Sequence, residues 1–370
     1  MKILFLADPI PSHTIKWVNS LSKSGVEILL FGLSDYNYEL YNREINIEIY
    51  KTPKIIKNRA DGHLFKSFYL TAYPSLKKVL KKFKPDILHS HYASSYGLLG
   101  ALCQFHPFFL SVWGNDVFDF PQKTILHKLL LQYILSKPDM LFSTSKIMAK
   151  ETSLYTKKKI NIIPFGVDTD IFKPKKVRNV FKESDLVIGT VKGLEDNYGI
   201  EYLVKAFIIL ENKYPNLPLR LLIVGGGSLE KKLKNQAKNL INQGKAIFTG
   251  HIPHNKISTY HNMIDIAVFP SISESFGVSV IEASACGIPV IISDVGGMPE
   301  IIKNNVTGIK VRSADENSIA EAIGKLIMDK NLRLKMGEMG RERVIRYFYW
   351  QNNIDKMILY YESYLKKEGQ

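Results

Sequence analysis

The sequence predicts an α/β protein with two Rossmann-like, doubly wound domains that face a central cleft. Two observations carry this prediction. Apolar strands alternate with amphipathic helices along the chain, which implies parallel sheets covered by helices on both faces. The chain also has 370 residues, more than one hydrophobic core usually supports. Ligands of such sheets collect beyond the carboxyl ends of the strands, so we expect both domains to present those ends to the cleft.

The elements follow one another in a regular order. The first half has strands over 3–7, 26–32, 86–91 and 108–113, with helices over 13–24 and 75–83. The second half has strands over 186–191, 219–224, 246–249 and 264–270, with helices over 200–211, 229–243 and 279–285. Gly25 and Gly287 follow helices, as glycine commonly does at helix ends.

A stretch of proline and charge without periodicity, residues 172–178, is typical of a linker. We therefore expect an N-terminal domain over 1–172 and a C-terminal domain over 173–349. An amphipathic helix follows over 350–370.

The composition favours a cytoplasmic protein that is either soluble or bound to the inner face of the plasma membrane. Cys103 and Cys286 are too few for a disulfide framework and have no CxxC spacing. The apolar run at the start spans about five residues and ends at Asp8, which favours a buried strand over a signal peptide. No apolar stretch approaches the roughly 20 residues of a membrane span.

The net charge of +15 is unevenly distributed. Residues 51–84 hold ten Lys or Arg and one acid, interleaved with aromatic residues. Such a segment suits an anionic membrane surface, and a solvated lysine-rich face is the simpler alternative. Nucleic acid would satisfy the same electrostatics, but no binding motif accompanies the charge, so no nucleic-acid partner is expected.

The segment 269–300 carries the clearest candidate site. Glu274 and Glu282 lie eight positions apart across a strand-to-helix junction. If the helix begins near Phe276, the amides of Phe276, Gly277 and Val278 are free to bind a diphosphate. Glu282 then lies roughly 9 Å further along the axis, about the distance from a diphosphate to its ribose diol. Two unrelated solvated glutamates would produce the same spacing.

This segment resembles the E-x7-E signature of the retaining glycosyltransferases of family 4. Further pieces of that pattern follow in order: NIIPFGVD at 161–168, LLIVGGG at 221–227, FTGHI at 248–252 and GGMPE at 296–300. The first half resembles a bacterial surface-polysaccharide subgroup through HSHYASSYGLLG at 89–100 and SVWGND at 111–116.

The resemblance implies the GT-B fold, with a final helix that packs back on the first domain. It assigns Glu274 to the donor sugar, Glu282 to the ribose, and the turn Gly225, Gly226 and Gly227 to close approach of backbone amides. Gly250 and Ile252 match the region that binds the base, where uridine and guanosine fit equally. The implied donor is a substrate, and no separate cofactor is expected.

The chain departs from the family in two places. Many relatives carry an Arg and a Lys where this sequence has Gly193 and Tyr198, which leaves Lys192 as the candidate for the leaving diphosphate, or else helix amides with Lys231 and Lys232. Trp113 occupies the position of a histidine that contacts the sugar. Because an indole cannot act as an acid or base, His91 and Asp116 are further candidates in the same region.

We therefore predict a metal-independent, retaining hexosyltransferase. It would move a hexose or N-acetylhexosamine from a UDP- or GDP-sugar to a lipid-linked glycan in lipopolysaccharide or capsule synthesis. Asp168 and Asp170 spell D-x-D but lie within the interdomain pattern, so no metal ligand is expected there. The alternatives are an epimerase or glycan phosphorylase of the same architecture, and a non-catalytic basic module that docks on a membrane or nucleic acid.

Overall fold

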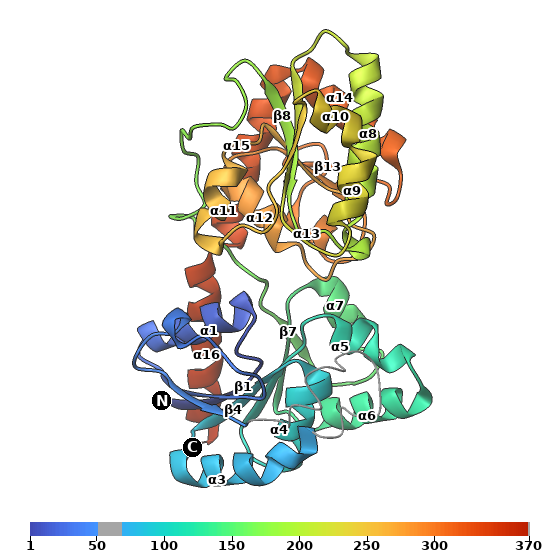
Figure 1. Ribbon diagram of the computed structural model, residues 1–370. Coiled ribbons are helices and arrows are strands. Elements are labelled where there is room, and N and C mark those ends of the chain that lie inside the picture. Colours follow the sequence, from blue (N-terminus) through green and yellow to red (C-terminus); the bar gives the residue numbers. More distant parts are fainter. Residues whose placement is uncertain (51–68, 369–370) are drawn as a thin grey trace. The chain divides into compact units, whose positions relative to one another are not determined.

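The computed structural model describes residues 1–50 and 69–368 (Figure 1). The chain forms two compact units, residues Met1–Pro164 with Asn353–Gln370, and residues Phe165–Asn352. The second unit begins a few residues before the expected boundary at 172/173. The basic segment over 51–84 is described only from residue 69 onward. No helix in the described ranges is long and apolar enough to cross a membrane.

The first unit is a seven-stranded parallel sheet with the order β3-β2-β1-β4-β5-β6-β7. The strands are β1 (Lys2–Leu6), β2 (Glu27–Gly32), β3 (Asn46–Ile49), β4 (Ile87–His91), β5 (Phe108–Ser111), β6 (Met140–Ser143) and β7 (Ile160–Ile162). The α-helices are α1 (Ser12–Lys23), α3 (Tyr73–Phe83), α4 (Leu98–Cys103), α5 (Asn115–Phe118), α6 (Ile125–Ser136), α7 (Lys146–Thr152) and α16 (Trp350–Glu368). Shorter turns are η1 (Tyr38–Leu40), η4 (Phe120–Gln122) and the π-helical η3 (Ala93–Gly97).

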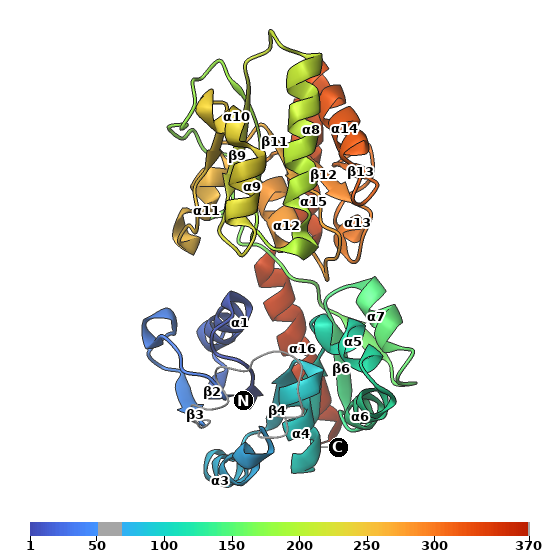
Figure 2. The same cartoon turned by 45° about the vertical axis from the view of Figure 1, so that its right-hand side comes forward.

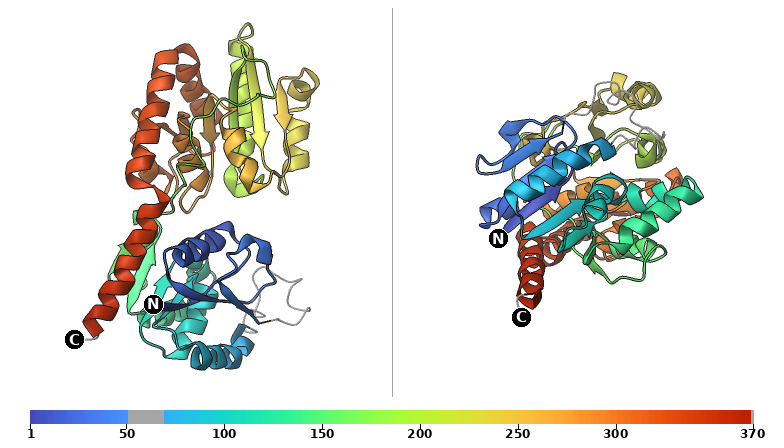
Figure 3. Two further views of the ribbon diagram at one scale, coloured as in Figure 1. Left: turned by 90° about the vertical axis from the view of Figure 1, so that its left-hand side faces the viewer. Right: turned by 90° about the horizontal axis from the view of Figure 1, so that it is seen from below.

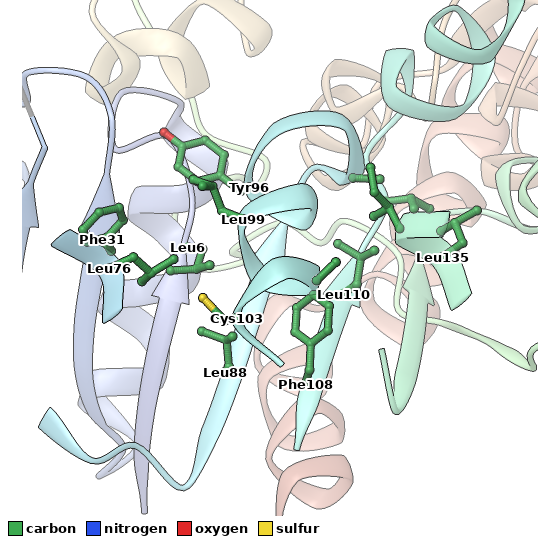
Figure 4. Close-up of a cluster of buried hydrophobic side chains, with 14 of the residues drawn as sticks. Leu6, Phe31, Leu76, Leu88, Tyr96, Leu99, Cys103, Phe108, Leu110 and Leu135 are labelled. Atoms are coloured by element: carbon green, nitrogen blue, oxygen red, sulfur yellow. The ribbon is translucent and has the colours of Figure 1, made fainter. Parts of the chain in front are cut away.

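Apolar side chains from three helices cover one face of this sheet. Leu76 of α3, Leu99 of α4 and Leu135 of α6 belong to one buried cluster with Leu88 and Leu110 of the strands (Figure 4). Strand residues alternate between faces, so a single buried sheet needs apolar cover on both sides.

Helices α1 and α16 cover the other face. Trp17, Val18 and Leu21 of α1 are buried. From α16, the fully buried Tyr361 hydroxyl lies 2.6 Å from His89 Nδ1, and Lys356 Nζ donates to the Ile162 carbonyl at 2.9 Å. Figure 3 shows residues 353–368 of α16 alongside this sheet.

The second unit is a six-stranded parallel sheet with the order β10-β9-β8-β11-β12-β13 (Figure 2). Its strands are β8 (Leu186–Val191), β9 (Leu219–Val224), β10 (Ala246–Phe248), β11 (Ile266–Phe269), β12 (Val290–Ser293) and β13 (Ile309–Val311). Its helices are η5 (Asp196–Tyr198), α8 (Ile200–Lys213), α9 (Glu230–Gln236), α10 (Lys238–Asn242), α11 (His254–His261), α12 (Val278–Ala285), α13 (Met298–Ile301), α14 (Glu316–Met328) and α15 (Lys330–Tyr347). The predicted class of two Rossmann-like domains is thus confirmed.

One predicted helix is wrong in detail. The helix expected over 229–243 is divided into α9 and α10 at Ala237, whose φ of −90° and ψ of 10° depart from helical values. Ala237 is fully buried. No residue type at this point breaks helices, so nothing in the sequence signals the division.

Candidate functional site

A lysine and a glutamate meet beyond the carboxyl ends of two central strands of the second unit. Lys192 directly follows β8, and Glu274 lies in the loop between β11 and α12. Lys192 Nζ pairs with Glu274 Oε2, and each side chain is only 13% exposed. Lys192 Nζ also lies 4.2 Å from the centroid of the Tyr198 ring. The pair places a cation for an anionic group beside a carboxylate that can accept from hydroxyl groups.

Close backbone packing fixes Glu274. Gly296 has a φ of +52°, and a Cβ added there would lie 1.6 Å from the Glu274 carbonyl oxygen. Any side chain at residue 296 would therefore displace the loop that carries the carboxylate.

The glycine turn after β9 packs on the loop that carries Lys192. A Cβ at Gly225, where φ is +136°, would lie 2.0 Å from the Lys192 carbonyl oxygen, and one at Gly227 would lie 2.4 Å from that of Leu194. Gly225 N also donates to the Gly250 carbonyl at 3.2 Å. The structure thus brings Gly225, Gly226 and Gly227 together with Gly250. Backbone contacts account for two of these glycines without any ligand.

Two acidic residues that the sequence analysis missed border the same turn. Glu195 accepts hydrogen bonds from the Ser228 amide at 3.0 Å and from the Ser228 hydroxyl, and these bonds lower the pKa of its carboxyl. Glu230 opens α9, and its Oε2 lies 3.6 Å from where a Gly226 Cβ would stand. The sequence did contain a signal for Glu230, since an acid in the first turn of a helix that follows a glycine-rich turn is favourably placed near the helix dipole.

The junction before α12 differs from the expectation. The helix begins at Val278, with Gly277 as its left-handed N-cap at a φ of 106°. Phe276 is buried between Phe165 and Phe348, with ring centroids 5.7 Å and 5.9 Å away, so it anchors the loop. Glu282 therefore lies four positions into the helix, about 6 Å along its axis and not the expected 9 Å.

Glu282 has a buried histidine beside it. Glu282 is 8% exposed, and its Oε2 lies 3.5 Å from Nε2 of the fully buried His261, which ends α11. Neither ring nitrogen of His261 has a hydrogen-bond partner among the described residues. Burial, and then the Glu282 charge, raise the pKa of Cys286 to about 12, so this thiol stays protonated at neutral pH. His261 was not predicted, because its position in the sequence carries no motif.

The candidates of the first unit, His91, Trp113 and Asp116, lie close together near the carboxyl end of β4. His91 is 2% exposed, with ring centroids 4.8 Å from Trp113 and 4.9 Å from Phe5. Its two ring nitrogens lack hydrogen-bond partners in the described part of the chain, and burial lowers its pKa to about 3. His91 is thus a neutral ring enclosed beneath the half-buried Trp113, not the open cleft residue that we expected.

Asp116 organises the backbone beneath Trp113. It is fully buried and accepts from the amides of Ala93 and Gly114 at 2.7 Å and of Trp113 at 3.1 Å. Burial raises its pKa, and these amides oppose that shift. Asp116 therefore holds two loops together, and it has no exposed surface with which to contact a substrate.

A further carboxylate at the end of β1 was also missed. Asp8 is partly buried, which raises its pKa, and it accepts from the Ile10 amide at 3.2 Å. It also raises the pKa of nearby Tyr41 and Tyr96, after the larger effect of burial. Asp8 ends the first predicted strand, a position that the rule for parallel sheets would have marked.

The remaining candidates have local partners. Asp168 Oδ1 accepts from the amides of Asp170 at 2.9 Å and Ile171 at 3.3 Å, which is a turn. Lys232 Nζ lies 3.0 Å from Glu201 on α8. Across residues 1–50 and 69–368, no three His, Cys, Asp or Glu side chains gather in a way that suits a metal ion.

Known proteins are similar to this chain in sequence and in fold. Two family models match: glycosyl transferases group 1 over residues 172–343 and glycosyl transferase 4-like over residues 2–145. An uncharacterised glycosyltransferase of Methanocaldococcus jannaschii is 26% identical over 338 residues, 90% of each chain. A capsular polysaccharide biosynthesis glycosyltransferase of Staphylococcus aureus is 30% identical over 261 residues, 66% of this chain and 68% of that one. The chain spans 52% of the length of two other curated relatives that it matches.

Solved structures agree on the fold. HepE of Anabaena, in complex with UDP and glucose, has a TM-score of 0.77 at 16% identity over 98% of this chain and 100% of that one. The architecture is that of the GT-B glycosyltransferases. This chain belongs to the group 1 family of glycosyl transferases, as the family model over residues 172–343 and the 30% identity over 68% of the S. aureus relative show.

Proposed function

We propose that this glycosyltransferase moves a hexose or N-acetylhexosamine from a UDP- or GDP-sugar to a growing, lipid-linked surface glycan, with retention at the anomeric carbon. The single observation that carries the donor proposal is the largely buried Lys192–Glu274 ion pair, which lies beside the glycine turns. The S. aureus relative, named for capsular polysaccharide biosynthesis, supports the class of acceptor.

Each residue has a proposed role at the donor. Glu274 accepts hydrogen bonds from sugar hydroxyls, and Lys192 neutralises the departing diphosphate, a group that needs charge stabilisation as it leaves. Glu282 accepts from the ribose diol. Main-chain groups at Gly250 and Ile252 contact the base. A donor that binds in this way separates Lys192 from Glu274, so each finds a new partner on the ligand.

The proposed chemical step needs no protein base. The acceptor oxygen bonds to the anomeric carbon on the face from which the phosphate oxygen departs. The departing phosphate oxygen takes the acceptor proton. This step is compatible with a neutral, enclosed His91 and with Trp113, which contributes an apolar face for a sugar ring.

The donor proposal is tested by thermal unfolding with UDP, GDP and their sugars. A ligand present at 100 times its dissociation constant stabilises the fold by about 2.7 kcal/mol. We expect one base to raise the melting temperature, and the anomeric configuration of the product, read by NMR, to match that of the donor. No stabilisation by any nucleotide would contradict the proposal. It would favour the non-catalytic alternative.

We also propose that the enzyme works at an anionic membrane surface. In the described part of the basic segment, α3 exposes Lys78, Lys81 and Lys82. Lys77 instead donates to the Cys103 carbonyl at 2.7 Å and lies over the Tyr73 ring. Leu76, Val79 and Leu80 of α3 are buried, so its contribution to membrane binding is mainly electrostatic.

A further inference from the structure

Helix α6 is apolar on two opposite sides. Its inner side buries Leu131, Ile134 and Leu135 against the sheet. Its outer side exposes four large apolar side chains: Ile125 at 66%, Leu126 at 72%, Leu129 at 53% and Tyr133 at 40%. At 100° per residue, these four residues centre on the side opposite to the buried three.

Scattered single apolar residues on a surface need no explanation, but one helix that exposes four is a patch. The only other residue of α6 on this outer side is Ser136, so the side is apolar apart from one hydroxyl, unlike the polar face of an ordinary amphipathic helix. The burial of the inner side already explains why the helix packs on the sheet, so the outer apolar side chains are not needed to account for it.

The charged residues of α6 and of the segments directly beside it in the sequence are all lysines. Lys123, Lys128 and Lys137 are exposed, and no acid occurs between Asp119 and Asp139 in the sequence. Lys137 Nζ lies 4.8 Å from the centroid of the exposed Tyr133 ring. Apolar side chains bordered by cations, with an aromatic ring among them, match the boundary between acyl chains and anionic headgroups.

The same face of the sheet carries the basic helix α3. Leu76 and Leu80 of α3 join Leu131 and Leu135 of α6 in one buried cluster, so both helices cover that face (Figure 1). Residues 73–84 hold five lysines and no acid. The two helices that cover this face of the first sheet are thus α6, which exposes apolar side chains, and α3, which exposes lysines.

We propose that the outer side of α6, formed by Ile125, Leu126, Leu129 and Tyr133, inserts into the interface of an anionic phospholipid membrane. The surrounding lysines bind its headgroups. Neither component suffices in this arrangement, because stable peripheral attachment generally needs two signals. The proposal rests on the membrane attachment proposed above, and its outcome is independent of whether the protein transfers sugars.

The test measures sedimentation of the full-length protein with phosphatidylcholine vesicles of which about a third of the lipid is phosphatidylglycerol, which is anionic. We expect Leu126→Glu/Leu129→Glu to weaken binding at least about tenfold, since two carboxylates would enter the interface. The matched control is Leu334→Glu/Leu359→Glu, which changes two leucines of 59% and 63% exposure on α15 and α16. The control should bind within about twofold of the unmodified protein.

A second variant separates charge from insertion. Lys123→Gln/Lys128→Gln/Lys137→Gln should weaken binding and reduce its dependence on salt, because screening acts on the lysines. Circular dichroism should show that all variants remain folded, since every changed side chain is exposed.

Three results would overturn the proposal. The first is unchanged vesicle binding by Leu126→Glu/Leu129→Glu, and the second is equal binding to pure phosphatidylcholine vesicles. The third is failure of the unmodified protein to bind any vesicle while it forms a dimer that Leu126→Glu/Leu129→Glu dissociates. In that case a second copy of the chain would cover the face.

Discussion

The two glutamates of the second unit differ in their surroundings, and this difference predicts different losses. Glu274→Ala should abolish transfer while nucleotide affinity is kept or raised, because Lys192 loses its partner and becomes free for phosphate. Glu282→Ala should weaken nucleotide binding by about tenfold or more, as expected for a lost charge-assisted hydrogen bond. Calorimetry with UDP and GDP checks both. Equal losses of affinity in the two variants would show that the roles are wrongly assigned.

Among the described residues, Glu282 is the one polar group that the structure places beside the ring nitrogens of His261, which predicts a positioning role. His261→Phe fills the same buried site but removes the ring nitrogen 3.5 Å from Glu282 Oε2. We expect the variant to bind the ribose nucleotide and its 2′-deoxy form with similar affinity. Its fold should be unchanged, and a Lys192 substitution should lower its nucleotide affinity as much as in the parent. Binding of both nucleotides, measured in the variant and the parent, decides this. A fall in stability with unchanged preference would mean that the histidine only packs.

The buried His91 predicts an acid-sensitive fold. Its folded pKa of about 3 lies below the ordinary value of 6.5, so the unfolded chain binds the proton more readily between these values. The stability that His91 contributes is therefore complete above pH 6.5 and falls as the pH drops toward 3. His91→Phe should reduce the slope of unfolding free energy against pH by about 1.4 kcal/mol per unit in this window. Urea titrations at pH 4 to 7 measure it, and an unchanged slope in His91→Phe would contradict this account.

At the scale of elements, the loops at strand ends depend on glycine. Gly296→Ala would place a Cβ 1.6 Å from the Glu274 carbonyl oxygen, whereas Gly244→Ala meets nothing within 4 Å. Both residues have positive φ, 52° and 67°, so both substitutions carry about 1 kcal/mol of backbone strain. Gly296→Ala should cost several times more and also lower donor affinity. Similar melting temperatures for the two variants would contradict this account.

The order of strands and helices was predictable because periodicity and glycine report directly on backbone conformation. Glu274 and Lys192 were found through motif position, and the structure brings them together. The remaining features escaped for two reasons. His261 gains its neighbour Glu282 only through packing between two helices, and the enclosure of His91 depends on Trp17 and Trp113 from other parts of the chain, so neither has a local signature in the sequence. Asp8 and Glu230 did have such a signature, at a strand end and in the first turn of a helix.

At the scale of the whole molecule, we predict activity without a divalent cation. The charge of the leaving group is assigned to Lys192, and the carboxylate of Asp168 is engaged by backbone amides. Transfer should therefore persist in excess EDTA, which a radiolabelled-sugar assay can follow. An absolute requirement for Mg²⁺ or Mn²⁺ would return Asp168 and Asp170 to the site. Lys192→Gln should lower the rate of transfer both in excess EDTA and in the presence of Mg²⁺.

The first unit is discontinuous in the chain, because residues 353–370 return to it after the second unit is complete. On the ribosome, β1 to β7 emerge early, but Tyr361, the partner of His89, is made only after the second unit. The continuous second unit can close its core during synthesis. Until α16 is made, the face of the first sheet that α1 and α16 share lacks part of its cover, so a truncated or stalled chain would expose that part and become a substrate for chaperones and proteases.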